Sequence, residues 1–166
     1  MGASVNPYAA YLGDAEPMAV LSDTVRKLVE LTAGLSKDQL AGHPLEGKWS
    51  IHESIAHLAD VEMVMGARCR WILFEPEPRL IGFDQDAWVM GWAREQEPID
   101  STLERFRVLR EANLRLFHVA SPEDLRRTGI HAERGSQTVL DYIALLAGHD
   151  INHLQQIGQL RSLIVG

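Results

Sequence analysis

Cysteine is almost absent from this chain of 166 residues, which contains only Cys69. A single cysteine excludes an internal disulfide and fits a reducing compartment. Basic clusters are also absent, because no run of Lys and Arg is longer than a pair and the net charge is -7. Binding to phosphates needs clustered positive charge, so the composition argues against nucleic acid as a partner.

Long hydrophobic runs are missing as well. The longest, from Val139 to Ala147, contains Asp141 and falls far short of the roughly 20 apolar residues that a membrane-spanning helix needs. The first residues contain neither the basic nor the apolar segment of a secretory signal. We therefore expect no membrane partner and a location in the cytoplasm. With 46% hydrophobic and 23% charged residues, the chain is typical of one globular domain, which we assign to residues 1–166.

Convincing strand alternation is not found, whereas helical periodicity follows four start signals. One signal is the capping box Ser50–Glu53, in which Ser50 accepts from the Glu53 amide and the Glu53 side chain reaches back. Glu53 therefore has a structural role. We expect four long helices and two shorter helical pieces, with the long ones beginning near Asp14, Ser50, Ser101 and Thr138 and the short ones at Ser36 and Ser121.

The segment from Glu75 to Asp100 contains three prolines and is too long for a tight turn between antiparallel helices. Such a connection lets the second and third helices run parallel, as in crossover bundles. The sequence therefore predicts an all-α four-helix bundle with a long crossover between helices 2 and 3. Within the crossover, residues 84–92 are expected to form a short helix over one end of the bundle, where Trp88 and Trp92 either cover a pocket or simply pack.

Two histidines of the last helix, His149 and His153, lie in the middle of its apolar stripe. Residues four apart lie about 40° from each other on a helix, so both rings can meet one ion. The structural alternative is a pair of core histidines satisfied by hydrogen bonds. A metal ion would satisfy both rings at once, which favours a metal site.

The second helix begins with IHESIAH, in which His52 and His57 are five apart rather than the four of the zinc protease motif. That spacing puts about 140° between them, so at most one can belong to a metal site. His57 lies at the edge of the apolar stripe and completes the predicted metal site with His149 and His153. The remaining histidines are expected at the surface or in loops, namely His43, His52, His118 and His131.

Several charged residues of these two helices have both a structural and a functional interpretation. Asp60, one turn after His57, either orients a ligand or is simply solvated. Glu62 is expected to pair with an arginine, whereas Asp150 is a candidate to support a ligand histidine. Arg68 lies three turns along from His57 on the same face, where it suits either a substrate carboxylate or a buried salt bridge.

Three segments, Trp49–Asp60, Asp84–Trp88 and Gly148–Ile157, together resemble the motifs of the DinB-like family, and the likeness covers nearly the whole chain. The resemblance implies a four-helix bundle with a long crossover, often dimeric, that binds a divalent metal through three histidines. In this sequence they map onto His57, His149 and His153. Some members of the superfamily are transferases or isomerases that use low-molecular-weight thiols.

Two classes of function remain open from the sequence. The first is an enzyme for a small-molecule substrate, in which three imidazoles on zinc or nickel leave positions for a low-molecular-weight thiol or for water. It would be a thiol S-transferase or isomerase, or alternatively a metal-dependent hydrolase; no catalytic residue beyond the ligands is assigned. The second is a non-catalytic metal-binding module, although a closed zinc site normally has four protein ligands. We also expect a homodimer, because two helices have apolar positions beyond what one core needs.

Overall fold

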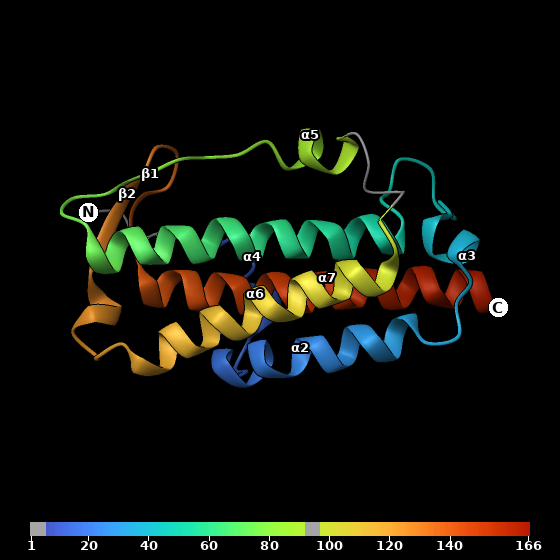
Figure 1. Ribbon diagram of the computed structural model, residues 1–166, viewed down its shortest axis with the longest axis horizontal. Coiled ribbons are helices and arrows are strands. Elements are labelled where there is room, and N and C mark those ends of the chain that lie inside the picture. The colour runs from blue at the N-terminus through green and yellow to red at the C-terminus, as the bar shows by residue number, and fades with distance from the viewer. Residues whose placement is uncertain (1–5, 92–96) are drawn as a thin grey trace.

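The computed structural model describes residues 6–91 and 97–166, so Trp92 lies outside the described part of the chain. Four long helices form the body of the molecule, as predicted (Figure 1). Their bounds are α2 (Pro17–Thr32), α4 (Ile51–Phe74), α6 (Ile99–Val119) and α7 (Val139–Val165). Among the described residues, no helix combines the length and the apolar character needed to cross a membrane.

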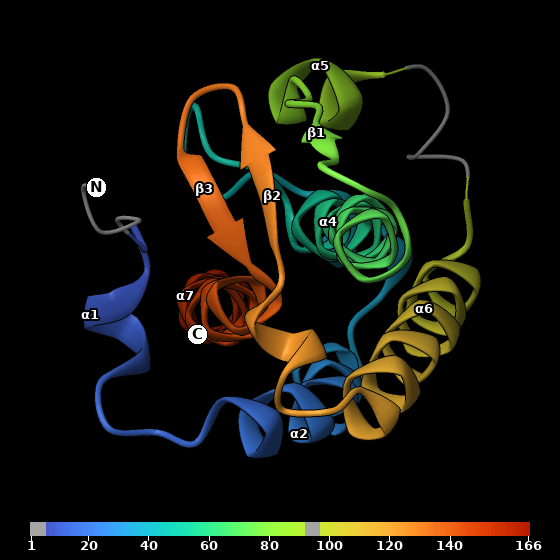
Figure 2. The same ribbon diagram turned by 90° about the vertical axis from the view of Figure 1, so that its left-hand side faces the viewer.

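The four helices pack around a common core, with α2 beside α7 and α4 beside α6 (Figure 2). In Figure 1, α4 and α6 run in one direction along the long axis, and α2 and α7 run in the other. Neighbouring helices of each pair are therefore parallel. This arrangement requires the long crossover, because a short turn can join only antiparallel neighbours.

Small elements connect the long helices. Two short helices were predicted, α3 (Lys37–Ala41) and α5 (Gln85–Met90), whereas α1 (Ala9–Leu12) was not. Helix α5 packs along the side of α4 rather than over an end of the bundle, which corrects the expected position (Figure 1). A single 3-10 turn, η2 (Asp124–Arg126), follows α6, close to the predicted start at Ser121.

A three-stranded sheet was also not predicted. It consists of β1 (Arg79–Leu80), β2 (Thr128–His131) and β3 (Gly135–Thr138) in the order β1-β2-β3. Strand β1 is parallel to β2, and β2 is antiparallel to β3. Strands of two to four residues are too short to show alternation in a sequence. Their pairing joins the crossover to the connection between α6 and α7.

Capping boxes mark the predicted helix starts at Ser50 and Thr138. Ser50 and Thr138 each accept a hydrogen bond from the third residue of their helix, and that residue's carboxylate accepts from the cap amide in return. The start predicted near Ser101 lies two residues too far along the chain, because α6 begins at Ile99 after Pro98. The side chain of Thr102 is instead buried and donates to Glu97 Oε2 at 3.0 Å.

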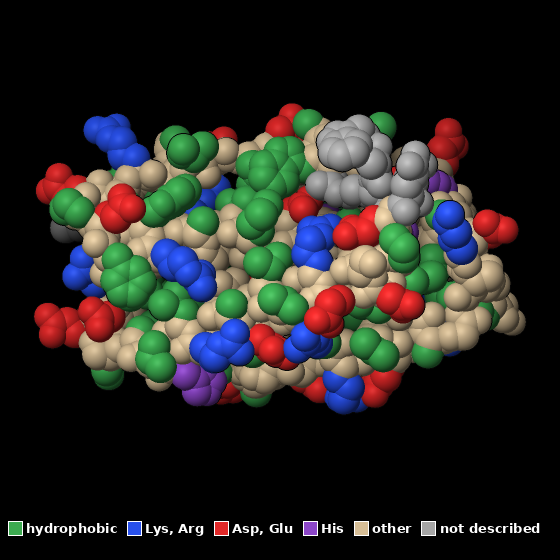
Figure 3. All heavy atoms as spheres, viewed as in Figure 1, with side chains coloured by type: hydrophobic (Ala, Val, Ile, Leu, Met, Phe, Trp, Pro, Cys, Tyr) green, Lys and Arg blue, Asp and Glu red, His purple; other side chains and the backbone are tan. Residues whose placement is uncertain are grey.

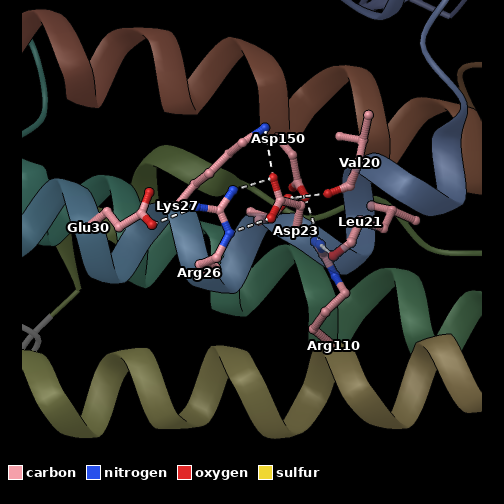
Figure 4. Close-up of polar contacts among 9 residues, drawn as sticks. Val20, Leu21, Asp23, Arg26, Lys27, Glu30, Arg110 and Asp150 are labelled. Atoms are coloured by element: carbon pink, nitrogen blue, oxygen red, sulfur yellow. Dashed lines mark hydrogen bonds and ion pairs between the residues drawn. The ribbon is translucent and has the colours of Figure 1, made fainter.

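A buried ion network crosses the core between the helices. Arg110 of α6 donates to Asp150 Oδ2 at 2.7 Å and to Glu62 Oε1 at 2.8 Å, and all three side chains are at most 1% exposed. Arg110 also donates to the Leu21 carbonyl, and Thr24 donates to Asp150, so the network links all four long helices. Figure 4 shows Arg110 reaching from α6 towards Asp150. The predicted arginine partner of Glu62 is confirmed.

Exposed charges have a different arrangement. On α2, Asp23, Arg26, Lys27 and Glu30 form ion pairs three or four residues apart, in front of the buried network (Figure 4). On the face shown in Figure 3, Lys and Arg side chains alternate with Asp and Glu, and this face has no extended basic patch.

Candidate metal centre

The three predicted ligands meet between α4 and α7. His57 Nε2 lies 3.1 Å from His149 Nε2, and the ring centroids of His149 and His153 are 4.4 Å apart. One nitrogen from each of the three rings lies within 4.8 Å of the others. An ion about 2.0–2.1 Å from each nitrogen would place such nitrogens about 3.4 Å apart, so the cluster needs only small shifts to hold one.

All three histidines are buried, and burial keeps His149 and His153 neutral. His57, His149 and His153 are 1%, 3% and 5% exposed. Burial lowers the pKa of His149 well below 6.5, helped by the neighbouring histidines, and lowers the pKa of His153 to about 4. The Nδ1 atoms of His149 and His153 are buried without a hydrogen-bond partner. Neutral imidazoles that lack partners fit the requirements of a metal ion.

Two aromatic rings, from Trp49 and Tyr8, surround the histidines. The Trp49 ring is nearly parallel to that of His153, with centroids 6.2 Å apart, and lies 4.8 Å from the His57 ring. Tyr8 approaches His149 edge-on at 5.0 Å. Sequence reasoning missed both residues as part of the site. The position of Trp49 one residue before the Ser50 cap was the available signal.

Gly148 allows the chain near Tyr8 to approach α7. A Cβ atom added at Gly148 would lie 2.5 Å from the Tyr8 carbonyl oxygen and 2.8 Å from its Cβ. Both contacts are far shorter than van der Waals distance, so only glycine permits this approach. The residue directly before His149 therefore sets how closely the N-terminal segment covers the site.

Two cavities of about 440 Å³ each border the cluster from different sides. The first reaches His149, and the second reaches His57 and His153. Both are lined by Tyr8 and Gln85, which lie between them. Trp88 lines neither cavity; it packs against Phe83 with centroids 4.9 Å apart, which agrees with the packing interpretation rather than that of a lid.

Two of the histidines expected at the surface or in loops are buried. His52 is 7% exposed, and its Nε2 lies 2.9 Å from Thr102 Oγ1, because α6 packs against the first turn of α4. His131 is 2% exposed and belongs to β2, which sequence analysis did not predict. His43 and His118 are exposed, as expected.

Both acidic candidates bind arginines. Asp60 is buried rather than solvated, and its Oδ1 accepts from Arg105 at 3.2 Å. Asp150 accepts from Arg110 and Thr24 and makes no hydrogen bond to a histidine of the cluster. Its predicted role in supporting a ligand histidine is therefore wrong, because the buried cation of α6 occupies the carboxylate.

Arg68 is fully buried, but the salt bridge considered for it is not formed with any described residue. Its Nε donates to the Ile81 carbonyl at 3.2 Å, and a second nitrogen donates to the same oxygen. Its Nη1 donates to Met65 Sδ at 3.4 Å. The side chain lines the cavity that reaches His149, so the alternative of a ligand anion stays open.

A family model of the DinB superfamily matches residues 21–157. The chain belongs to the DinB superfamily. The matched region extends from α2 into α7 and includes all three clustered histidines. The family resemblance and the fold expected from the sequence are thereby confirmed.

Several known proteins are similar to this chain over most of its length. A protein of Oceanobacillus iheyensis named “Putative metal-dependent hydrolase” is 26% identical, and the match covers 79% of this chain and 75% of the relative. A relative of the same name from Geobacillus thermodenitrificans is 29% identical over 85% of this chain and 78% of its own. Among solved structures, YfiT from Bacillus subtilis superimposes with a TM-score of 0.81 at 21% identity, covering 87% of this chain and 83% of that one. YfiT is described as “a probable metal-dependent hydrolase with an unusual four-helix bundle topology”, and the likeness shows a shared fold.

The donor set of this DinB superfamily member consists of three histidine nitrogens. In the described part of the chain, no fourth His, Cys, Asp or Glu belongs to the group. The only cysteine, Cys69, is buried, and burial raises the pKa of its thiol to about 12. The arrangement can hold an ion between two cavities, and Cys69 is unsuited to act as a nucleophile there.

Proposed function

We propose that this protein is a metal-dependent hydrolase in which His57, His149 and His153 hold one divalent ion, zinc or nickel. The observation that carries the proposal is the convergence of three buried imidazoles at the meeting point of two cavities. The names of the relatives from Oceanobacillus and Geobacillus support hydrolysis. A divalent ion held by such donors supplies a Lewis acid that polarises a carbonyl and lowers the pKa of a water or thiol ligand.

The residues around the three histidines orient the imidazole rings and offer polar contacts to a substrate. Trp49 and Tyr8 fix the imidazole rings by packing against them and exclude bulk water from two sides. In the second cavity, Gln156 donates to Asn152 Oδ1 at 3.1 Å. These amides provide donors and acceptors for the polar atoms of a substrate next to His57 and His153.

Thiol transfer is the second candidate, and the presence of two separate cavities favours it. One cavity can hold a low-molecular-weight thiol while the other holds the electrophile, with the three histidines between them. In such a transfer the thiol loses its proton, a carbon–sulfur bond forms and the leaving group departs with the electron pair. Cys69 cannot replace the external thiol, because its side chain is buried in the core.

Metal analysis of protein purified without a histidine tag tests the site. We expect one ion per chain in the wild type and none in His153→Ala. His118→Ala, which changes an exposed histidine, is the matched control and should keep the ion. A wild type that takes up no zinc or nickel from a defined buffer would refute the metal centre.

Turnover assays then distinguish the reactions. Esters, amides and lactones without thiol test hydrolysis, and electrophiles with small thiols test transfer. We expect activity in the first set and its loss in His153→Ala. Thiol-dependent turnover alone would favour the transferase, whereas metal binding without any turnover would favour the non-catalytic module. Full turnover by His153→Ala would show that the ion is not catalytic.

We also propose a homodimer. Val29 of α2 and Val108 of α6 are about half exposed, at 50% and 47%, although both helices pack in the bundle. Light scattering at micromolar concentration checks this, and a monomer would contradict it.

A further inference from the structure

Arg68 is a buried cation without an anionic partner in the described part of the chain. Its side chain is 1% exposed, and its hydrogen bonds go to the Ile81 carbonyl and to the Met65 sulfur, which are both uncharged. Removing a guanidinium from water costs several kcal/mol unless an anion compensates. A ligand that supplies negative charge would recover this cost.

A second arginine with an unsatisfied donor lines the same cavity. Arg134, just before β3, donates through Nε to Gln137 Oε1 at 3.3 Å, while its Nη2 is buried without a hydrogen-bond partner. The charge of Arg134 lowers the pKa of Arg68, after the larger effect of burial. Two cations are thus close enough to repel each other, with no carboxylate of the described residues pairing with either.

Uncharged donors belong to the same group. The Tyr142 hydroxyl is buried without a hydrogen-bond partner, and the Arg68 guanidinium lies 5.9 Å from the Tyr142 ring centre. His131 accepts at Nδ1 from the backbone amides of Glu133 and Arg134, at 3.2 and 3.4 Å. This tautomer leaves the proton on Nε2, so His131 is a neutral donor at the wall of the cavity.

Two acidic side chains also line this cavity and do not neutralise it. Asp84 accepts from the Ala87 amide and caps α5. Glu133 is exposed to solvent. Neither forms an ion pair with Arg68 or Arg134, so positive charge prevails where these two arginines line the cavity.

We propose that Arg68, Arg134, Tyr142 and His131 form a subsite for a carboxylate of the substrate, remote from the three histidines. This inference rests on the proposed function, because it concerns the substrate of that site. Tyr142 precedes His149 by seven residues, which is about 10 Å along α7. The wall between is apolar, with Val61, Met65 and Leu145. The fitting substrate has its reactive group at one end, an apolar body and a carboxylate at the other end.

A carboxylate fits better than a phosphate, because the Tyr142 and His131 donors are neutral and the cavity is lined by apolar side chains beside them. Arginine pairs with a carboxylate through two parallel hydrogen bonds. Inorganic phosphate is the ion to compare in the test.

Calorimetric titration with 6-phenylhexanoate and with its neutral counterpart 6-phenylhexan-1-ol tests the subsite. The titration uses chelated, metal-free protein, so that the carboxylate cannot bind to an ion. We expect the acid to bind at least about tenfold more tightly than the alcohol. Arg68→Gln and Arg134→Gln should each remove most of this preference, and Arg107→Gln, at an exposed arginine of α6, should keep it. Phosphate should not compete at millimolar concentration.

Each negative result of the titration would contradict a different part of the proposal. Arg134→Gln changes a partly exposed residue, so it stays informative if Arg68→Gln does not fold. Equal binding of acid and alcohol by the wild type would overturn the subsite and leave the hydrolase proposal intact. A preference that survives both arginine variants would also overturn it, and competition by phosphate would assign the subsite to phosphate. An arginine-dependent preference that persists in His153→Ala would support the subsite even if no hydrolysis were found.

Discussion

Arg68 and Arg110 lie on neighbouring parallel helices and are equally buried, at 1% exposure, but their partners differ completely. Arg110 binds two carboxylates and a carbonyl, whereas Arg68 binds a carbonyl and a thioether. Burial alone therefore does not indicate what a charged residue does. A buried arginine that pairs with carboxylates of the protein has a structural role. A buried arginine without such a carboxylate is a place where an anionic ligand can bind.

The largest effect is expected from Arg110→Met. The substitution leaves Glu62 and Asp150 buried without their cation, so we expect a loss of about 3–5 kcal/mol in the free energy of unfolding. Urea unfolding followed by circular dichroism measures it. The control is Arg107→Met, which removes exposed ion pairs and should cost about 1 kcal/mol or less. Equal losses in the two variants would remove the distinction between buried and exposed networks.

The histidine cluster resembles Arg68, because two of its buried nitrogens, Nδ1 of His149 and Nδ1 of His153, also lack a hydrogen-bond partner. Zinc or nickel at about one hundred times its dissociation constant should therefore raise the free energy of unfolding by about 2.7 kcal/mol. A chelator should reverse the gain, and His153→Ala should not show it. Thermal or urea unfolding at several metal concentrations checks this, and a gain of the same size in His153→Ala would place the ion elsewhere.

Arg68→Met should cost far less than Arg110→Met. The variant loses hydrogen bonds to the Ile81 carbonyl but also removes a buried charge without a carboxylate, so we expect a change of about 1 kcal/mol or less. The same urea measurement compares the two arginines directly. A loss as large as that of Arg110→Met would mean that Arg68 is a structural residue.

The smallest effect concerns His52, a buried group whose partner is the neutral Thr102. Burial lowers the pKa of His52 below 6.5. Below pH 6.5 the unfolded chain therefore binds more protons, so His52 makes the free energy of unfolding fall as the pH decreases through its folded pKa. His52→Gln should reduce the difference between unfolding at pH 7.5 and at pH 5.5. An unchanged difference would show that His52 does not contribute.

Local signals in the sequence predicted the parts of the fold that depend on neighbours along the chain. The capping boxes of α4 and α7 are local, and so is the spacing of His149 and His153 on one helix. The choice of His57 over His52 followed from the angle between the two side chains around the helix axis and from the position of His57 at the edge of the apolar stripe. These features need no knowledge of how the helices pack.

Features that depend on distant segments were missed. The burial of His52 depends on α6, and the sheet depends on a meeting of β1 with β2 about 50 residues later. Arg110 was not identified as the partner of Asp150, because both become buried only when all four long helices pack together. Tyr8 reaches His149 only because Gly148 leaves room for it, which a helical wheel cannot show.

The two residues shared by both cavities, Tyr8 and Gln85, come from the N-terminal segment and the crossover. The three clustered histidines come from α4 and α7. The parts that would fix an ion and the parts that divide the space around it therefore come from different segments of the chain. New substrates can be sought by varying residues of these two segments other than Tyr8, while the four long helices that carry the histidines keep their sequence.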